Sequence, residues 1–205
     1  MKRKMICVWL AALMICSAGR MALADSVGTN PAASSNQSSG SVYKKVYIMV
    51  KTVPIYCFYS PFMKDYFWTT SEDEKKQLEE AYRTGQGTYE YQGIWDYAEQ
   101  SAADWNMPVY RFWNKKTTDH FYTTSDAEKA QLEKDLKSGK DDYVYEGIAW
   151  YVPRLSNRPI YRFFDTVAFN HYYTSDEQTK DRLAQAFLNG TGTYRYEGIA
   201  WNGYE

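Results

Sequence analysis

Arginine, histidine and aromatic residues recur together in this sequence, in two sets about fifty residues apart. The two sets, which we call the Arg/His faces, are Arg111, Trp113, His120 and Tyr122, and then Arg162, Phe164, His171 and Tyr173. Guanidinium and imidazole groups donate hydrogen bonds, and an aromatic ring covers the apolar C–H face of a polar molecule. These eight residues are therefore the candidate ligand-binding residues, and a sugar is the kind of ligand that they suit.

The same residue types also suit a purely structural role. An arginine held between aromatic rings forms a cation–π pair, which would pack beneath a helix without any ligand. A slip of one residue in strand register would also exchange the two faces of each hairpin. The sequence leaves both interpretations open.

Catalytic and metal-binding patterns are not found in the sequence. Cys57 is the one cysteine after residue 24, and the two histidines occupy the same position of different repeats. A catalytic triad needs three different groups that converge on one point, and zinc needs three or four close ligands. Glu146 and Glu197 could pair as carboxylates, but each lies in a Tyr-Glu-Gly segment where a structural hydrogen bond is the favoured role. The sequence predicts no catalytic residue, no metal and no cofactor, and a cell-wall hydrolase stays as a less favoured alternative.

Three copies of one aromatic-rich repeat supply the elements that must position the Arg/His faces. The copies begin at prolines, and we assign them to residues 54–107, 108–158 and 159–205. In each copy, two short aromatic segments joined by a polar loop predict a hairpin, which a helix and a third aromatic strand follow. The helices are predicted from their N-cap residues and from the glycines that end them: Ser71, Ser125 and Asp176, then Gly85, Gly139 and Gly190.

The predicted fold is β-rich with short helices. One hairpin–helix–strand unit cannot bury its own apolar face, so we expect three units in a closed pseudo-threefold, trefoil-like arrangement. A small propeller-like ring and an open row of α+β repeats are the alternatives. If residue 113 pairs with residue 120, strand alternation places the Arg/His face on one side of the hairpin. The other side then carries Tyr110, Phe112, Phe121 and Thr123, which we expect to form the core.

The order of the motifs resembles a known repeat family. Repeat 2 reads Tyr-Arg-Phe-Trp-Asn, then His-Phe-Tyr-Thr-Thr-Ser, then Tyr-Glu-Gly-Ile-Ala-Trp. This is similar to a repeat domain of unknown function found in exported bacterial and fungal proteins, often attached to cell-wall or carbohydrate-active enzymes. The resemblance implies secretion and an accessory surface-binding role, and it supplies no ligand and no catalytic residues. Repeat 1 departs from the pattern, with Cys57 for Arg, Tyr66 for His and Trp95-Asp96 for Ala-Trp.

The N-terminal segment has the pattern of a secretory signal. Basic residues precede an apolar run, and Ala22-Leu23-Ala24 matches a signal-peptidase site, so we assign residues 1–24 to a signal peptide. Residues 25–44 are rich in small polar residues and are assigned to a flexible linker, and residues 45–205 to a single domain. We therefore expect a secreted protein, with attachment to the cell surface as an option.

Charge excludes some partners. Four of the 24 Lys and Arg residues lie in the signal, so 20 remain against 25 Asp and Glu, a net charge of −5. Nucleic acids and anionic membranes demand a basic surface, so neither is an expected partner. No later segment is apolar enough for a membrane span.

Together these features predict a secreted, non-catalytic binding module for carbohydrate or cell-wall glycan. A protein-binding adhesin or inhibitor is the alternative. Because repeat 1 lacks the Arg and the His, the Arg/His faces predict up to two ligand sites per chain. Cys57 has no partner in the mature chain, and we favour a buried thiol over an intermolecular disulfide.

Overall fold

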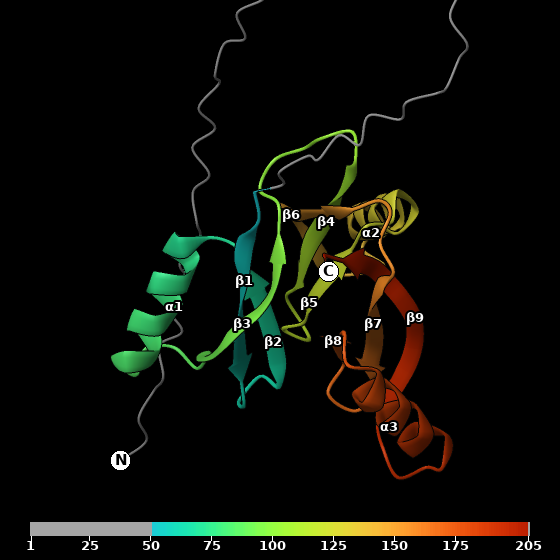
Figure 1. Cartoon of the computed structure of the whole chain (residues 1–205). Helices are drawn as coiled ribbons and strands as arrows, with labels where there is room; N and C mark the ends of the chain where they lie inside the picture. The colour runs from blue at the N-terminus through green and yellow to red at the C-terminus, as the bar shows by residue number, and fades with distance from the viewer. Residues whose placement is uncertain (1–50, 205) are drawn as a thin grey trace, which may run out of the picture. The chain divides into compact units, whose positions relative to one another are not determined.

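The computed structural model describes residues 51–204, and these described residues belong to one compact unit. The described part contains three successive hairpin–helix–strand groups (Figure 1). The predicted signal peptide and linker lie outside the described residues. None of the helices in the described part has the length and apolar character that a membrane span requires.

Each repeat forms its own three-stranded antiparallel sheet. The elements are β1 (Val53–Ser60), β2 (Asp65–Thr69), α1 (Glu72–Arg83) and β3 (Glu90–Ala98); β4 (Asn106–Asn114), β5 (His120–Thr123), α2 (Asp126–Ser138) and β6 (Tyr143–Pro153); and β7 (Arg158–Asp165), β8 (Asn170–Thr174), α3 (Glu177–Leu188) and β9 (Tyr194–Gly203). The strand orders are β2-β1-β3, β5-β4-β6 and β8-β7-β9. The described sheets stay separate and do not merge into one closed barrel. The prediction of a β-rich fold with short helices is confirmed.

The hairpins have the register that the sequence predicts. Trp113 pairs with His120, and Phe112 pairs with Phe121. Repeats 1 and 3 pair in the same way. In repeats 2 and 3, the Arg/His face therefore lies on the opposite side of the sheet from Phe112 and its equivalent, Phe163.

The predicted helix starts also have the expected geometry. Each predicted N-cap side chain accepts a hydrogen bond from the backbone amide three residues later, which satisfies an amide that the helix leaves without a partner. In the third strands, Gly93, Gly147 and Gly198 have φ angles of 111°, 117° and 115°. Residues with a side chain rarely adopt such angles, and the strand pairing shifts register beside each glycine.

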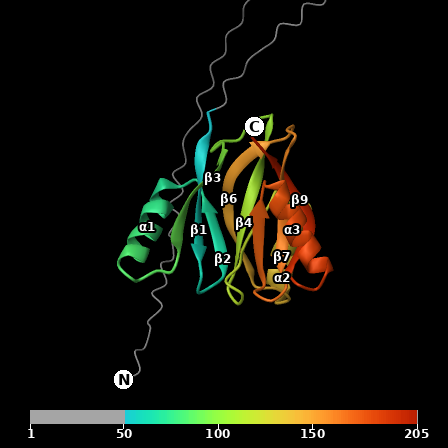
Figure 2. The same cartoon turned by 60° about the horizontal axis from the view of Figure 1, so that its bottom comes forward.

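Both faces of each sheet are covered. In repeat 1, Phe58 and Phe67 pack with Leu78 of α1, and each helix lies on the outer side of its own sheet (Figures 1 and 2). The opposite faces meet in a larger core shared by all three repeats, formed by Ile55, Cys57, Trp68, Ala98, Val109, Tyr122, Trp150, Val152, Ile160, Tyr173 and Trp201. Strands β2, β5 and β8 approach one another around this core. The sequence predicted a core only on the side of the sheet that carries Phe112. The structure has a second, larger core on the opposite side, which carries Tyr122 and Tyr173.

Candidate functional site

The Arg/His faces lie against neighbouring repeats. In repeat 2, His120 is 8% exposed and Tyr122 is fully buried, and the Arg111 side chain is 12% exposed. The equivalent residues of repeat 3 are buried to a similar degree. Trp113 and Phe164 are partly exposed. We call the contact surfaces between repeats the 1–2, 2–3 and 3–1 junctions.

At the 1–2 junction, repeat 2 presents its histidine and arginine to carboxylates of repeat 1. The fully buried Asp65 lies with Oδ2 2.6 Å from Nδ1 of His120, and its Oδ1 accepts from the His120 amide at 3.2 Å. Arg111 donates to both oxygens of Glu74, in the first turn of α1, at 3.1 and 2.8 Å. Such two-point charged hydrogen bonds are strong and directional, so they fix one repeat against the next.

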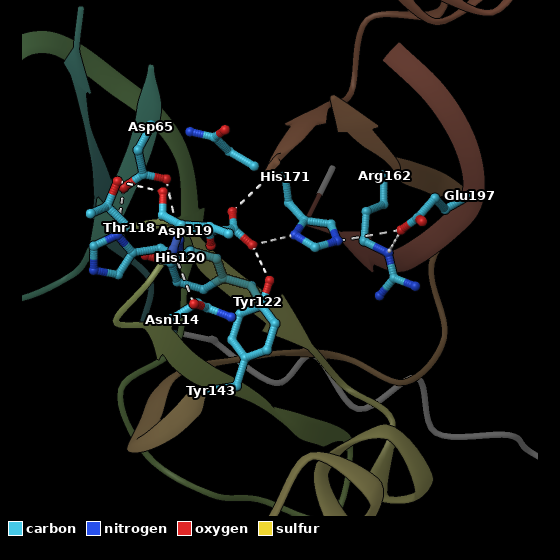
Figure 3. Close-up of polar contacts among 12 residues, drawn as sticks. Asp65, Asn114, Thr118, Asp119, His120, Tyr122, Tyr143, Arg162, His171 and Glu197 are labelled. Atoms are coloured by element: carbon cyan, nitrogen blue, oxygen red, sulfur yellow. Dashed lines mark hydrogen bonds and ion pairs between the residues drawn. The ribbon is translucent and has the colours of Figure 1, made fainter. Parts of the chain in front are cut away.

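The 2–3 junction repeats this arrangement (Figure 3). Nδ1 of His171 lies 2.6 Å from Oδ2 of Asp119, and Arg162 donates to both oxygens of Glu128 at 3.1 and 2.8 Å. Arg162 also donates from Nε to Glu197 at 3.0 Å. The imidazole of His171 thus lies between two carboxylates, with its Nε2 3.5 Å from Glu197.

The carboxylates around His171 hold its imidazole in the charged form. Burial alone would lower the pKa of His171, but Asp119 and Glu197 outweigh burial and raise this pKa to about 9. Burial likewise opposes ionisation of Glu197, yet the hydrogen bond and charge of His171 lower the pKa of Glu197 to about 2. A protonated imidazole has no lone pair to accept a proton, so His171 is unsuited to act as a general base near neutral pH.

At the 1–2 and 2–3 junctions, a tyrosine hydroxyl also forms hydrogen bonds with the backbone of the preceding repeat. The hydroxyl of Tyr122 donates to the carbonyl oxygen of Trp68 at 2.8 Å and accepts from its amide at 3.0 Å. The hydroxyl of Tyr173 does the same for Tyr122 at 2.7 and 2.9 Å. Each buried hydroxyl therefore satisfies a backbone amide and carbonyl of the preceding repeat, as buried backbone groups require.

The 3–1 junction replaces both members of each charged pair. Cys57 and Thr179 stand where the other junctions have Arg and Glu, and Tyr66 and Asn170 stand where they have His and Asp. A single replacement would leave a buried charge without its partner, which is costly. The departures of repeat 1 from the motif therefore match departures in repeat 3.

Uncharged hydrogen bonds and ring contacts replace the charged pairs at the 3–1 junction. Asn170 donates to two backbone carbonyls of the β1–β2 turn at 3.0 and 2.8 Å, and the ring of Tyr66 lies 5.2 Å from that of Tyr172. Cys57 is buried, as the sequence predicted, and burial raises the pKa of its thiol to about 12.

A surface hollow of about 730 Å³ also lies at the 3–1 junction. Its lining residues are Thr52, Ile94, Trp95, Asp96, Tyr97, Arg158 and Tyr204. Arg158 donates from Nη1 to both oxygens of Asp96 at 2.8 and 2.7 Å, and from Nη2 to Ser175 at 3.2 Å. The Asp96 side chain is 8% exposed and the Arg158 side chain 33% exposed, so the guanidinium is the more accessible member of the pair.

A second hollow, of about 480 Å³, lies at the 1–2 junction. It is lined by the residues that begin α1 and by β6, with Thr70, Ser71, Glu72, Asp73, Gln100, Ile148, Ala149, Trp150 and Tyr151. Four of its nine lining residues are polar residues at the start of α1, and its one tryptophan is 2% exposed. Among residues 51–204, no group of three or more His, Cys, Asp or Glu side chains is placed to hold a metal ion.

The 3–1 hollow is not among the sites that the sequence predicts. Trp95 and Asp96 depart from the repeat motif, whereas no sequence pattern marks Arg158 or Tyr204. The available signal was a comparison of copies, because alanine occupies the position of Trp95 in repeats 2 and 3. Binding of a ligand by the Arg/His faces stays a prediction, and their arginine and histidine side chains are engaged in contacts between repeats.

Comparison with known proteins gives one family. A family model described as "Domain of unknown function (DUF5648)" matches residues 35–139 and 133–205. The match falls in two overlapping segments, as a repeated sequence can give. No curated protein and no solved structure matches the chain.

Proposed function

Because the chain belongs to the family described as Domain of unknown function (DUF5648), we propose its function from the geometry of its own residues. The protein is a secreted, non-catalytic module that binds carbohydrate, with cell-wall glycan as the leading class of ligand. Its three repeats form a pseudo-threefold, trefoil-like arrangement. Contacts of β2, β5 and β8 with one another, and of β3, β6 and β9 with one another, support that arrangement.

The main observation in favour of glycan binding is the hollow at the 3–1 junction. It combines the aromatic residues Trp95, Tyr97 and Tyr204 with the ion pair of Arg158 and Asp96. A sugar ring has apolar C–H faces and a rim of hydroxyl groups, so flat rings beside charged donors and acceptors complement it. The volume of about 730 Å³ lies within the range of about 300–1,000 Å³ that is usual for ligand pockets.

The Arg/His faces support a non-catalytic role in a different way. Their charged groups join the repeats, with Arg111 bound to Glu74 and Arg162 bound to Glu128. His171 is held in the charged form by Asp119 and Glu197. These contacts make a rigid support for a surface site, and they leave His171 without the lone pair that a general base needs.

A protein ligand is the second candidate. Isoleucines at the same position of the three third strands, Ile94, Ile148 and Ile199, are 52%, 46% and 59% exposed. Exposed apolar side chains contribute to a protein-binding surface where they form one contiguous patch.

Binding assays with the wild-type protein test the proposal. A glycan array and sedimentation with purified cell wall should show binding, and labelled peptidoglycan should not be turned over. Failure to bind any polysaccharide or wall fraction would contradict the glycan function. Capture of a protein with indifference to all sugars would favour the second candidate, and turnover would favour a wall hydrolase.

A further inference from the structure

We propose that the 3–1 hollow is one glycan site per chain, which takes an uncharged pyranose unit. Trp95, Tyr97 and Tyr204 provide the stacking surface, and the pair of Arg158 and Asp96 provides the hydrogen bonds. This inference rests on the proposed glycan-binding function and deepens it, because it assigns the residues, the number of sites and the charge of the ligand. It differs from the two sites that the Arg/His faces predict.

Trp95 and the pair of Asp96 and Arg158 have no equivalent at the other two junctions, whereas Ile94 and Tyr97 correspond to Ile148 and Tyr151 of repeat 2. Asp96 occupies the position of Trp150 and Trp201, which are buried at 2% and 5% exposure. Arg158, just before the proline that opens repeat 3, occupies the position of Met107 and Val53. The 1–2 and 2–3 junctions therefore have apolar side chains at the positions of Arg158 and Asp96. A partly buried ion pair is no more stabilising than such apolar packing. The charged pair at the 3–1 junction therefore calls for a role other than holding the fold.

A glycine makes room for this pair. A Cβ atom at Gly203 would lie 2.8 Å from Nη1 of Arg158 and 2.9 Å from Oδ2 of Asp96. Such distances are shorter than packed atoms tolerate, so a larger residue would displace the pair. The equivalent residues, Ala98 and Val152, have side chains and are buried in the shared core.

Trp95 brings a ring to a place where the other repeats have none. Ala149 and Ala200 occupy the equivalent positions. Trp95 is partly buried and its ring centroid lies 5.5 Å from that of Trp68, so the fully buried Trp68 supports it from below. Tyr97 is 48% exposed and lines the same hollow. A supported ring beside an exposed ring is suited to stack on a sugar face.

The charges around the hollow favour a neutral ligand. Asp96 compensates the charge of Arg158, and the nearby Glu99 accepts from the hydroxyl of Tyr204 and from Nε1 of Trp105 at 3.1 Å. An anionic ligand would meet the carboxylate of Asp96, and a cationic ligand would meet Arg158. A neutral hydroxyl can accept from the guanidinium and donate to the carboxylate, so it suits both members of the pair.

Calorimetric titration of the full chain tests the inference. The probes are neutral β-1,4-linked tetrasaccharides of glucose and of N-acetylglucosamine, and an acidic tetrasaccharide of galacturonic acid. Wild type should bind at least one neutral probe at one site per chain, and more tightly than the acidic probe. Trp95→Ala, which installs the residue of repeats 2 and 3, should weaken binding about tenfold or more. Phe62→Ala, at a ring that is 75% exposed and outside the hollow, should have no effect.

A second variant tests the polar half of the site. Gly203→Ala should displace Arg158 and weaken binding, and melting curves identify which variants are folded. Tyr97→Ala replaces Trp95→Ala in the test if the latter does not fold. Unchanged binding by the folded ring and glycine variants would overturn the inference and leave the glycan function standing. Two sites per chain, or tighter binding of the acidic probe, would also overturn it. Absence of binding by wild type to any probe, wall fraction or polysaccharide would remove the glycan function itself.

Discussion

The stability of the fold should fall between pH 6 and pH 9 because His171 is buried in its charged form. The pKa of His171 is raised from 6.5 to about 9 in the folded protein. A group with a raised folded pKa stabilises the fold fully below its unfolded pKa, and this contribution is lost as the pH rises through the folded pKa. With about 1.4 kcal/mol for each pKa unit, the loss by pH 9 amounts to about 3 kcal/mol.

Urea unfolding followed by tryptophan fluorescence measures this loss. Wild type and His171→Gln are compared at pH 6 and pH 9, since glutamine keeps a polar side chain but cannot take a proton. The variant should be less stable than wild type at pH 6 and should lose much less stability at pH 9. Wild type and the variant share Cys57 and the tyrosines. The contributions of these groups to the pH dependence of the unfolding free energy therefore cancel when the values for the two proteins are subtracted. Lys116→Gln, at a cation whose side chain is 77% exposed, should behave as wild type.

Two results would contradict a buried, charged His171. Wild type could be as stable at pH 9 as at pH 6, in which case His171 is not charged in the fold. Alternatively, His171→Gln could keep the full pH dependence of wild type, in which case another group causes it.

Three further predictions concern the junctions and the third strands. A double-mutant cycle on Arg162→Leu and Glu128→Gln should give a coupling free energy of about 1 kcal/mol, because the Glu128 side chain is 38% exposed and water screens the pair; a coupling near zero would contradict the bidentate contact. The double variant His171→Tyr with Asp119→Asn, which copies the pair at the 3–1 junction, should be more stable than the sum of its single variants predicts, as measured by urea unfolding. Gly198→Ala should cost about 1 kcal/mol in the same assay, because φ is 115° and an added Cβ would meet no atom within 4 Å; an unchanged stability would show that the strand relaxes there.

The elements within each repeat could be predicted because their signals are local. The alternation of Phe112 and Arg111 with their hairpin partners fixes the register, and Ser125 marks the start of α2 through one short-range hydrogen bond. The positive φ at Gly147 likewise follows from a bend within one strand. None of these features depends on where the other repeats lie.

The surroundings of the Arg/His faces could not be predicted, since they depend on contacts between repeats. Alternation separates two faces of a strand, but it does not say what covers each of them. Asp65 and His120 lie 55 positions apart in the chain, and no local pattern joins them. One signal was present within the sequence itself, because Cys57 and Thr179 depart from the motif together. A paired departure of this kind indicates a contact between the copies.

A crystal structure of the protein with a bound neutral tetrasaccharide would show directly where the glycan lies. We expect one sugar chain per protein chain, with a pyranose ring against Trp95 and hydroxyl groups within hydrogen-bond distance of Arg158 and Asp96. A sugar held at Trp113 or Phe164, with the 3–1 hollow empty, would contradict this expectation.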